Sequence, residues 1–249
     1  MALKTELRTQ GDFLFKYRSY FPLIILIIAL YQYVQTELND FSLDQAAKET
    51  YEIWCLMVCL FGLFIRVITI GFTADNTSGR NTLVGQVAES INTTGIYSTL
   101  RHPLYLGNFF MWLGLAGFTH NMWFIVAFSF LYWLYYERIM YAEEAFLTDK
   151  FGDAYTKYAA GVPAFIPSFK KVVKPKYEFS WRKVIRQEKA GILNMFGVIL
   201  LFRLVAEYIA TKTFDVENIW IYGFGASVVW YVVIKTIQKT TNVLSKDRN

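Results

Sequence analysis

The chain has 249 residues, of which 55% are hydrophobic and 18% are charged, with a formal net charge of +5. An average soluble domain carries roughly 25% charged residues, whereas here the apolar residues gather in runs that approach the about 20 residues a membrane-spanning helix needs. This excludes an ordinary soluble domain. Because the basic residues flank the apolar runs, they indicate contact with anionic lipid headgroups rather than with nucleic acid.

The apolar runs predict about six membrane segments. In chain order they cover residues 20–34, 53–72, 105–118, 122–136, 190–209 and 219–234. Only Thr119-His120-Asn121 separates the third run from the fourth, which predicts a tight helical hairpin. No alternating pattern of period two recurs, and a bilayer does not tolerate open sheet edges. The predicted fold class is therefore all-α, a polytopic helical membrane protein.

Basic residues alternate with the predicted segments. They are frequent before the first run and sparse in the acidic connection 37–52. The connection 73–101 carries Arg80 and Arg101, and basic residues are frequent again in the connection 142–189. Lys and Arg favour the cytoplasmic side of a membrane. We therefore expect both termini in the cytoplasm, together with the two long connections, which are long enough to be functional.

The most informative motif is Arg101-His102-Pro103, at the predicted start of the third segment. Pro103 suits the first turn of a helix, where no N–H donor is lost. Arg101 and His102 would then lie at a helix N-terminus, whose N–H groups and positive dipole favour a carboxylate or a phosphate. Arg101 alone could equally be a membrane anchor, but the nearby Tyr97 and Tyr105 favour a binding site.

Two adjacent carboxylates, Glu143 and Glu144, follow the fourth apolar run. Ionisable residues at a membrane surface are costly unless they are paired, and the hairpin should bring this pair beside Arg101 and His102. A carboxylate here could accept both hydroxyls of a ribose or pair with Arg101. A zwitterionic, aromatic, ribose-bearing ligand such as S-adenosylmethionine fits these groups, and its sulfonium tolerates tyrosine faces.

The stretch 95–107, the Glu143-Glu144 pair and the tail 151–167 together resemble the superfamily of isoprenylcysteine carboxyl methyltransferases and phospholipid methyltransferases. The resemblance covers residues 86–167. It implies an integral membrane methyltransferase that encloses S-adenosylmethionine between helices at the cytosolic face, with residues 89–92 also lining the cofactor. The cofactor-binding candidates it implies are Tyr97, His102, Pro103, Leu104, Tyr105 and Glu143, and the catalytic candidates are Arg101 and Glu144.

The resemblance leaves the methyl acceptor open. The family places a substrate arginine one turn before the glutamate, where this chain has Ile139 with Arg138 adjacent. A prenylcysteine carboxylate, a phospholipid amine, a lipid phosphate and a small thiol all stay candidates. We expect the acceptor to be a lipid or lipid-soluble molecule, with no metal and no nucleic acid involved, and the protein to lie in a bacterial inner membrane with its cofactor site facing the cytoplasm.

Two other functions compete with a methyltransferase. Sterol reductases, which use NADPH, share a similar Arg-His-Pro-x-Tyr-Leu-Gly string but are usually longer, with more spans before it. A transporter or scaffold without catalytic activity would place polar residues at mid-membrane, whereas here they gather at one face.

The resulting organisation has three parts. Residues 1–85 form N-terminal membrane helices and a loop, residues 86–169 form the cofactor-binding core with the hairpin, and residues 170–249 form a basic interfacial segment followed by two membrane helices. The basic stretch 170–186 carries interspersed aromatic residues, which fits either an amphipathic interfacial helix or a basic linker near the headgroups.

Several single residues receive simpler interpretations. His120 is expected to be a turn residue on the opposite membrane side from the motif. Arg203 and Glu207 lie four residues apart and should form an ion pair within their helix or within the bundle. Arg66 and Lys235 are expected to extend towards the headgroups.

Overall fold

A computed structural model describes residues 2–39, 45–74, 77, 81–82, 85–86, 88–214 and 219–244. Within these ranges the regular secondary structure is helical, apart from one pair of two-residue strands, so the predicted helical class is confirmed. The elements are α1 (Leu3–Lys16), α2 (Phe21–Leu38), α3 (Gln45–Gly71), β1 (Asn81–Thr82), β2 (Gly85–Gln86), the 3-10 helix η1 (Gly95–Ser98), α4 (Pro103–Gly117), α5 (Met122–Phe151), α6 (Asp153–Gly161), α7 (Trp181–Thr211) and α8 (Ile219–Thr240).

Four of these helices, α2, α3, α7 and α8, are long and apolar enough to cross a membrane. The predicted hairpin is present as α4 and α5, joined by a turn. The 15 residues of α4 extend about 22 Å at 1.5 Å per residue, less than the roughly 30 Å of a hydrocarbon core. The total of about six segments and the cytoplasmic position of the termini stay predictions.

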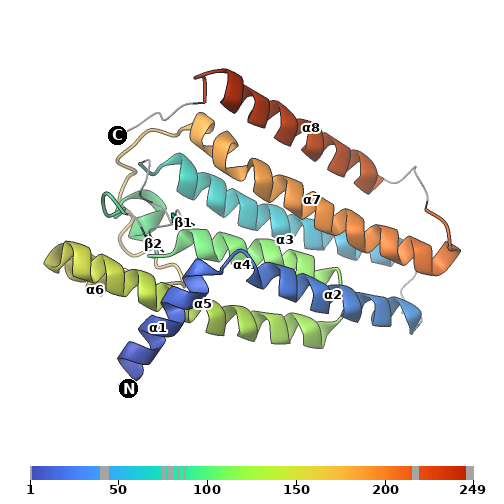
Figure 1. Cartoon of the computed structure of the whole chain (residues 1–249), viewed down its shortest axis with the longest axis horizontal. Helices are drawn as coiled ribbons and strands as arrows, with labels where there is room; N and C mark the ends of the chain where they lie inside the picture. Colours follow the sequence, from blue (N-terminus) through green and yellow to red (C-terminus); the bar gives the residue numbers. More distant parts are fainter. Residues whose placement is uncertain are drawn as a thin grey trace.

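Figure 1 shows the long helices running along one common direction, with η1, the strand pair and α6 gathered at the end where α3 finishes and α4 begins. The turn between α4 and α5 lies at the opposite end. Helix α1 packs across α5, and α7 packs against α8. The segments that carry the predicted motifs therefore meet at one end of the bundle.

Small residues allow α3 and α4 to cross closely, and these two helices form the most extensive contact in the bundle. A Cβ atom at Gly62 would lie 2.5 Å from the carbonyl oxygen of Gly107, and one at Gly107 would lie 2.6 Å from Cγ of Arg66. Close approach through small residues is typical of membrane helices. It lets the side chain of Arg66 pass over α4 towards the interior.

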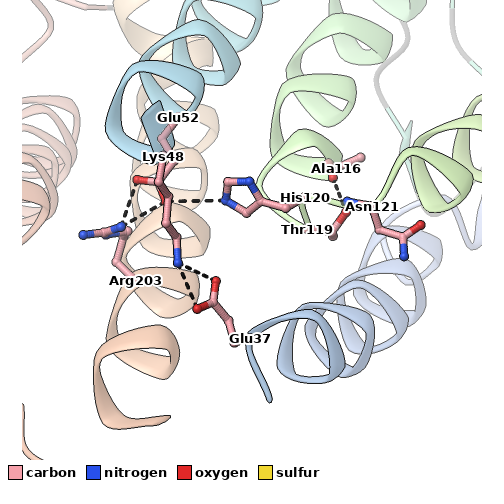
Figure 2. Close-up of polar contacts among 8 residues, drawn as sticks. All are labelled: Glu37, Lys48, Glu52, Ala116, Thr119, His120, Asn121 and Arg203. Carbon is pink, nitrogen blue, oxygen red and sulfur yellow. Dashed lines mark hydrogen bonds and ion pairs between the residues drawn. The ribbon is translucent and has the colours of Figure 1, made fainter. Parts of the chain in front are cut away.

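A second polar cluster lies at the far end of the bundle, near the α4–α5 turn (Figure 2). The carboxylate of Glu52, which is 1% exposed, accepts hydrogen bonds of 3.0 Å from Arg203 on α7. His120 occupies the turn as predicted, with φ at 51°, and its Nε2 lies 3.7 Å from Glu52. Beside them, Lys48 forms an ion pair of 2.6 Å with Glu37. Arg203 thus forms an ion pair with Glu52 of α3, a partner that the sequence did not predict, because the predicted partner was Glu207.

The amphipathic helix predicted for residues 170–186 is wrong, because residues 170–180 are not helical and α7 begins only at Trp181. The alternative, a basic linker, describes this stretch. Its backbone forms hydrogen bonds with η1. The carbonyl of Val173 accepts from the N–H of Gly95 at 3.0 Å, and the N–H of Val173 donates to Oγ of Ser98 at 2.9 Å. Ser180 then caps α7 by accepting from the N–H of Lys183 at 3.3 Å.

Candidate functional site

A cavity of about 410 Å³ opens at the end of the bundle where α3 ends and α4 begins. Side chains from α1, α3, α4, α5, α6 and α7, from η1 and from the turn after α1 line it. It holds most of the predicted site residues, namely Tyr97, Arg101, His102, Leu104, Tyr105 and Glu143, and also Ser90, Ile91 and Asn92 from the stretch expected to line the cofactor. Pro103 and Glu144 lie outside this lining.

His102 occupies the N-cap position of α4, and Pro103 takes the first helical position as the sequence predicts. The His102 ring is buried, with Nε2 2.8 Å from Oε1 of Glu144 and Nδ1 3.7 Å from Oε2 of Glu143. The hairpin therefore brings the two predicted motifs into direct contact, although they are 42 residues apart in the chain.

The two carboxylates of α5 have different partners. Glu144 lies 3.1 Å from Nε of Arg101, whose Nη1 also donates to the carbonyl of Ala159 at 3.1 Å. Glu143 accepts a hydrogen bond of 2.7 Å from the hydroxyl of Tyr105, and that ring stacks on His102. Glu144 is thus held against Arg101 at the edge of the site, while Glu143 presents its carboxylate to the cavity.

The segment after α6 accepts hydrogen bonds from backbone N–H groups at the start of α4, where the sequence predicted an anion site. The N–H of Arg101 donates to Pro163 at 2.9 Å, and that of His102 donates to Ala164 at 3.1 Å. The backbone amides of both residues are therefore already used. Attraction for an anion at this helix end depends on the helix dipole and on the side chains of Arg101 and His102.

Helix α6 contributes tyrosines that were not predicted as site residues. Tyr155 and Tyr158 line the cavity, and the hydroxyl of Tyr158 donates to the carbonyl of Tyr97 at 2.7 Å. Burial raises the pKa of Tyr97 and of Tyr158, so both hydroxyls stay protonated at neutral pH. Their position in the tail that carried the family resemblance was the signal that could have identified them.

Arg66, which was expected to extend towards the headgroups, forms hydrogen bonds with two neighbouring helices of the bundle. Its Nε and Nη2 donate to Glu188 of α7 at 3.0 and 2.5 Å, and its Nη1 donates to the side chain of Asn108. Arg66, Asn108 and Gln187 all line the cavity. A charged residue inside an apolar run was the available signal, but its partner lies 122 residues away.

The positions near the expected substrate arginine face elsewhere. Arg138 donates from Nε to Gln10 of α1 at 3.0 Å, and Ile139 is fully buried among apolar side chains. Neither residue belongs to the described lining of the cavity.

Comparison with known proteins gives the family. Residues 51–154, which include most of α3, all of α4 and α5 and both polar motifs, match the profile of the phospholipid methyltransferase family. These residues belong to the isoprenylcysteine carboxyl methyltransferase and phospholipid methyltransferase superfamily. The family predicted from the motifs is thereby confirmed. No solved structure matches the chain.

Curated relatives in this superfamily carry two kinds of name. The protein-S-isoprenylcysteine O-methyltransferase of Schizosaccharomyces pombe is 41% identical over 76 residues, which cover 30% of this chain and 32% of the relative. That of Saccharomyces cerevisiae is 30% identical over 131 residues, 53% of this chain and 54% of the relative. The cobalt-zinc-cadmium resistance protein CzcN of Cupriavidus metallidurans is 34% identical over 116 residues, 45% of this chain and 50% of the relative. The chain thus spans about a third to a half of the length of these relatives.

Proposed function

We propose that this protein is a membrane methyltransferase that uses S-adenosylmethionine and transfers its methyl group to a lipid or a lipid-soluble acceptor. The observation that carries the proposal is the pair Glu143 and Tyr105, hydrogen-bonded at 2.7 Å on the wall of a cavity within a segment of the methyltransferase superfamily. The named relatives support the reaction class, and the residues at the cavity support the choice of methyl donor.

The cavity fits S-adenosylmethionine in size and chemistry. Its volume of about 410 Å³ falls within the roughly 300–1,000 Å³ of small-molecule sites. Glu143 would accept the ribose hydroxyls, Arg101 and His102 would face the carboxylate, and the rings of Tyr97 and Tyr105 would contact the adenine or the sulfonium. Bound S-adenosylmethionine would supply an electrophilic methyl group on a cationic sulfur.

The residues of this chain would then act through positioning and exclusion of water, which are the main contributions available in such a transfer. The Tyr105–Glu143 hydrogen bond orients the carboxylate, and the Arg101–Glu144 ion pair fixes Arg101 at the edge of the site. Tyr97, Tyr155 and Tyr158 cover the cavity from η1 and α6. Arg101 and Glu144 thus serve the proposed reaction by holding the donor in place.

We further propose that the cavity faces the cytoplasm and that the protein crosses a bacterial inner membrane about six times. The basic linker 170–180 lies at the end of the bundle that holds the cavity, since it bonds to η1. From the acidic stretch 37–52, Glu37 near the end of α2 and Glu52 near the start of α3 lie at the opposite end. This asymmetry agrees with the preference of Lys and Arg for the cytoplasmic side.

Equilibrium binding of radiolabelled S-adenosylmethionine and of NADPH to the detergent-solubilised protein tests the proposal. We expect S-adenosylmethionine to bind, and Glu143→Gln to weaken its binding by about tenfold or more, since a lost hydrogen bond to a charged group costs about 1.5–3 kcal/mol. The exposed Glu178→Gln variant is the matched control and should bind normally. Binding of NADPH alone would favour a reductase. If neither S-adenosylmethionine nor NADPH binds, the enzyme proposal is overturned.

A further inference from the structure

The segment that connects α6 to α7, residues 162–180, exposes apolar and basic side chains together. Its exposed large apolar side chains are those of Ile166, Phe169, Val172 and Val173. Its exposed lysines are Lys170, Lys171, Lys174 and Lys176. Only one acidic residue, Glu178, lies in the segment. A group of exposed apolar side chains bordered by charges is typical of a contact surface, and this connecting segment carries such a group.

Hydrogen bonds fix the backbone of the connecting segment, although it is irregular. The N–H of Ser168 donates to the carbonyl of Thr99 at 2.9 Å, and that of Lys176 donates to Oγ1 of Thr94 at 3.1 Å. Between them, Val173 bonds to η1 through both its N–H and its carbonyl. The exposed side chains therefore project from a fixed backbone rather than from a free loop.

The end of the connecting segment lies where two candidate membrane spans end and begin. The N–H of Ser180 donates to the carbonyl of Gly71 at 2.9 Å, and Gly71 is the last residue of α3. Trp181, which is 65% exposed, begins α7 directly afterwards. Both helices are long and apolar enough to cross a membrane, and tryptophan is enriched where such helices meet the headgroups. In a membrane, the connecting segment would therefore lie at the level of the headgroups, at the end of the bundle that holds the cavity (Figure 1).

The side chains of the connecting segment select an anionic lipid as its partner. Each lysine near an acidic membrane surface strengthens attachment about fivefold. Ile166 and Phe169, which are 77% and 75% exposed, would gain nothing from a free phosphate, because only an apolar environment removes their surface from water. A soluble acidic protein would have to compete with the membrane that α7 holds beside the segment. Basic and apolar side chains in one surface therefore fit an anionic phospholipid.

The connecting segment also bonds to the motif beside the cavity. The carbonyls of Pro163 and Ala164 accept from the N–H groups of Arg101 and His102, at 2.9 and 3.1 Å. Arg101 and His102 line the cavity, as does Tyr97 of η1. A partner that binds the segment in this conformation therefore stabilises the motif in the conformation that shapes the cavity. Because such coupling is reciprocal, a ligand in the cavity and a lipid on the segment strengthen each other's binding.

We propose that the connecting segment is a docking surface for anionic phospholipids and that an acidic membrane thereby strengthens ligand binding in the cavity. The lysines contact the lipid phosphates, and the exposed apolar side chains enter the boundary between headgroups and acyl chains. The docking surface does not depend on the proposed reaction. The effect on the cavity rests on the proposed S-adenosylmethionine site and adds a regulation of that site by the composition of the membrane.

Competition between two lipids tests the docking surface. The full chain in detergent receives equal amounts of phosphatidylglycerol and phosphatidylcholine with the same acyl chains, and native mass spectrometry counts the lipids retained. We expect phosphatidylglycerol to exceed phosphatidylcholine about fivefold or more, and the excess to fall at high salt, because salt screens exposed charges. Equal retention of the two lipids would overturn the inference and would leave an acidic protein as the partner that fits the lysines.

Paired lysine variants locate the surface. Lys171→Gln with Lys174→Gln should lower the phosphatidylglycerol excess about fivefold or more. Lys150→Gln with Lys157→Gln is the matched control, because it removes two exposed charges from α5 and α6 at the same end of the bundle and should leave the excess unchanged. If both double variants retain the same excess, the assignment to the connecting segment is wrong.

Phe169→Ser with Val172→Ser distinguishes a lipid from a free phosphate. This variant keeps every lysine, and it should lower lipid retention at low and at high salt alike, because salt does not screen the burial of apolar side chains. Glycerol phosphate, which carries the anion without acyl chains, should not displace phosphatidylglycerol from the wild type. Displacement by glycerol phosphate would show that the segment binds the phosphate alone and would overturn the lipid docking.

Binding of S-adenosylmethionine in nanodiscs tests the effect on the cavity. Nanodiscs of phosphatidylcholine alone are compared with nanodiscs that also contain phosphatidylglycerol. We expect the acidic lipid to lower the dissociation constant of the wild type about fivefold. Lys171→Gln with Lys174→Gln should abolish this change, whereas Lys150→Gln with Lys157→Gln should keep it. The two variants carry the same net charge, so their difference separates the segment from the general attraction of an acidic membrane for a cationic ligand.

The outcomes keep the two proposals distinguishable. Binding in phosphatidylcholine alone should be the same in the wild type and in both lysine variants, which also shows that the variants are folded. If S-adenosylmethionine binds the wild type in neither membrane, the proposed function fails, while the lipid competition still decides the docking surface. If it binds equally well in both membranes, the effect on the cavity is overturned.

Discussion

Glu188 of α7 binds Arg66 of α3 through two nitrogens, at 3.0 and 2.5 Å, and thereby joins the C-terminal part of the chain to the wall of the cavity. The carboxylate is 1% exposed, and the arginine also donates to Asn108 of α4. The ion pair and the hydrogen bond to Asn108 thus connect α3, α4 and α7. Glu188 lies outside the segment that matches the family.

Removing this carboxylate should destabilise the protein strongly. Glu188→Gln leaves a buried guanidinium without its counter-ion, which costs about 3–5 kcal/mol. The double variant Arg66→Met with Glu188→Leu removes both charges and should recover most of that loss. Thermal unfolding in detergent measures both effects, with Glu178→Gln as control. Equal stability of Glu188→Gln and the control would show that the ion pair contributes little.

The close crossing of α3 and α4 should not tolerate a methyl group. Gly107→Ala places a Cβ 2.6 Å from the Arg66 side chain and 2.8 Å from the carbonyl oxygen of Gly62, and overpacking of this kind costs about 1–3 kcal/mol. Gly225→Ala in α8 is the matched control, because its added Cβ has no described atom within 4 Å. That variant should be neutral or slightly stabilising, since alanine favours helix. A similar unfolding temperature for the two variants would contradict the packing argument.

The polar cluster at the far end should affect the stability of the protein without changing its affinity for S-adenosylmethionine. Glu52→Gln removes the carboxylate that accepts from Arg203 and approaches His120, so we expect a lower unfolding temperature. The cavity lies at the other end of α3, and the dissociation constant of S-adenosylmethionine should stay within about twofold of the wild type, since distant sites behave independently. A large loss of ligand affinity in a folded variant would show that the two ends are coupled.

Tyr158 should stabilise the site in a pH-dependent way. Its hydroxyl donates to the carbonyl of Tyr97, and burial raises its pKa above the usual value of 10.0. A raised pKa means that the contribution of the protonated form is fully present below pH 10 and is lost at higher pH. Tyr158→Phe should lower stability by about 1 kcal/mol at pH 7 and flatten the pH profile of unfolding above pH 9. A profile identical to that of the wild type would contradict this role.

Local sequence patterns predicted the helical bundle and the centre of the site. The hairpin followed from a three-residue break between apolar runs, and it placed His102 beside Glu144 as the structure shows, 2.8 Å apart. These features depend on neighbours in the chain or on a single short turn. A pattern of apolar residues and one break is sufficient to define them.

Features that depend on the packing order of distant helices were not predictable in this way. The partner of Arg66 lies 122 residues away, and nothing local indicates that α7 rather than α8 packs against α3. Helices α1 and α6 were missed because neither contains a long apolar run. Tertiary contacts stabilise them instead: Gly11 of α1 packs against the backbone of Arg138, and Tyr158 of α6 bonds to η1.

The irregular segment after α6 lies along the motif residues and forms several backbone hydrogen bonds with them. Pro163 accepts from the N–H of Arg101, Ala164 accepts from that of His102, and Ser168 donates to the carbonyl of Thr99. These stretches are more than sixty residues apart, yet their amides are shielded by the same bonds. They should therefore open together as one cooperative unit in hydrogen exchange. We therefore expect the motif and the segment after α6 to form a single foldon. A ligand bound in the cavity should then slow the hydrogen exchange of both segments.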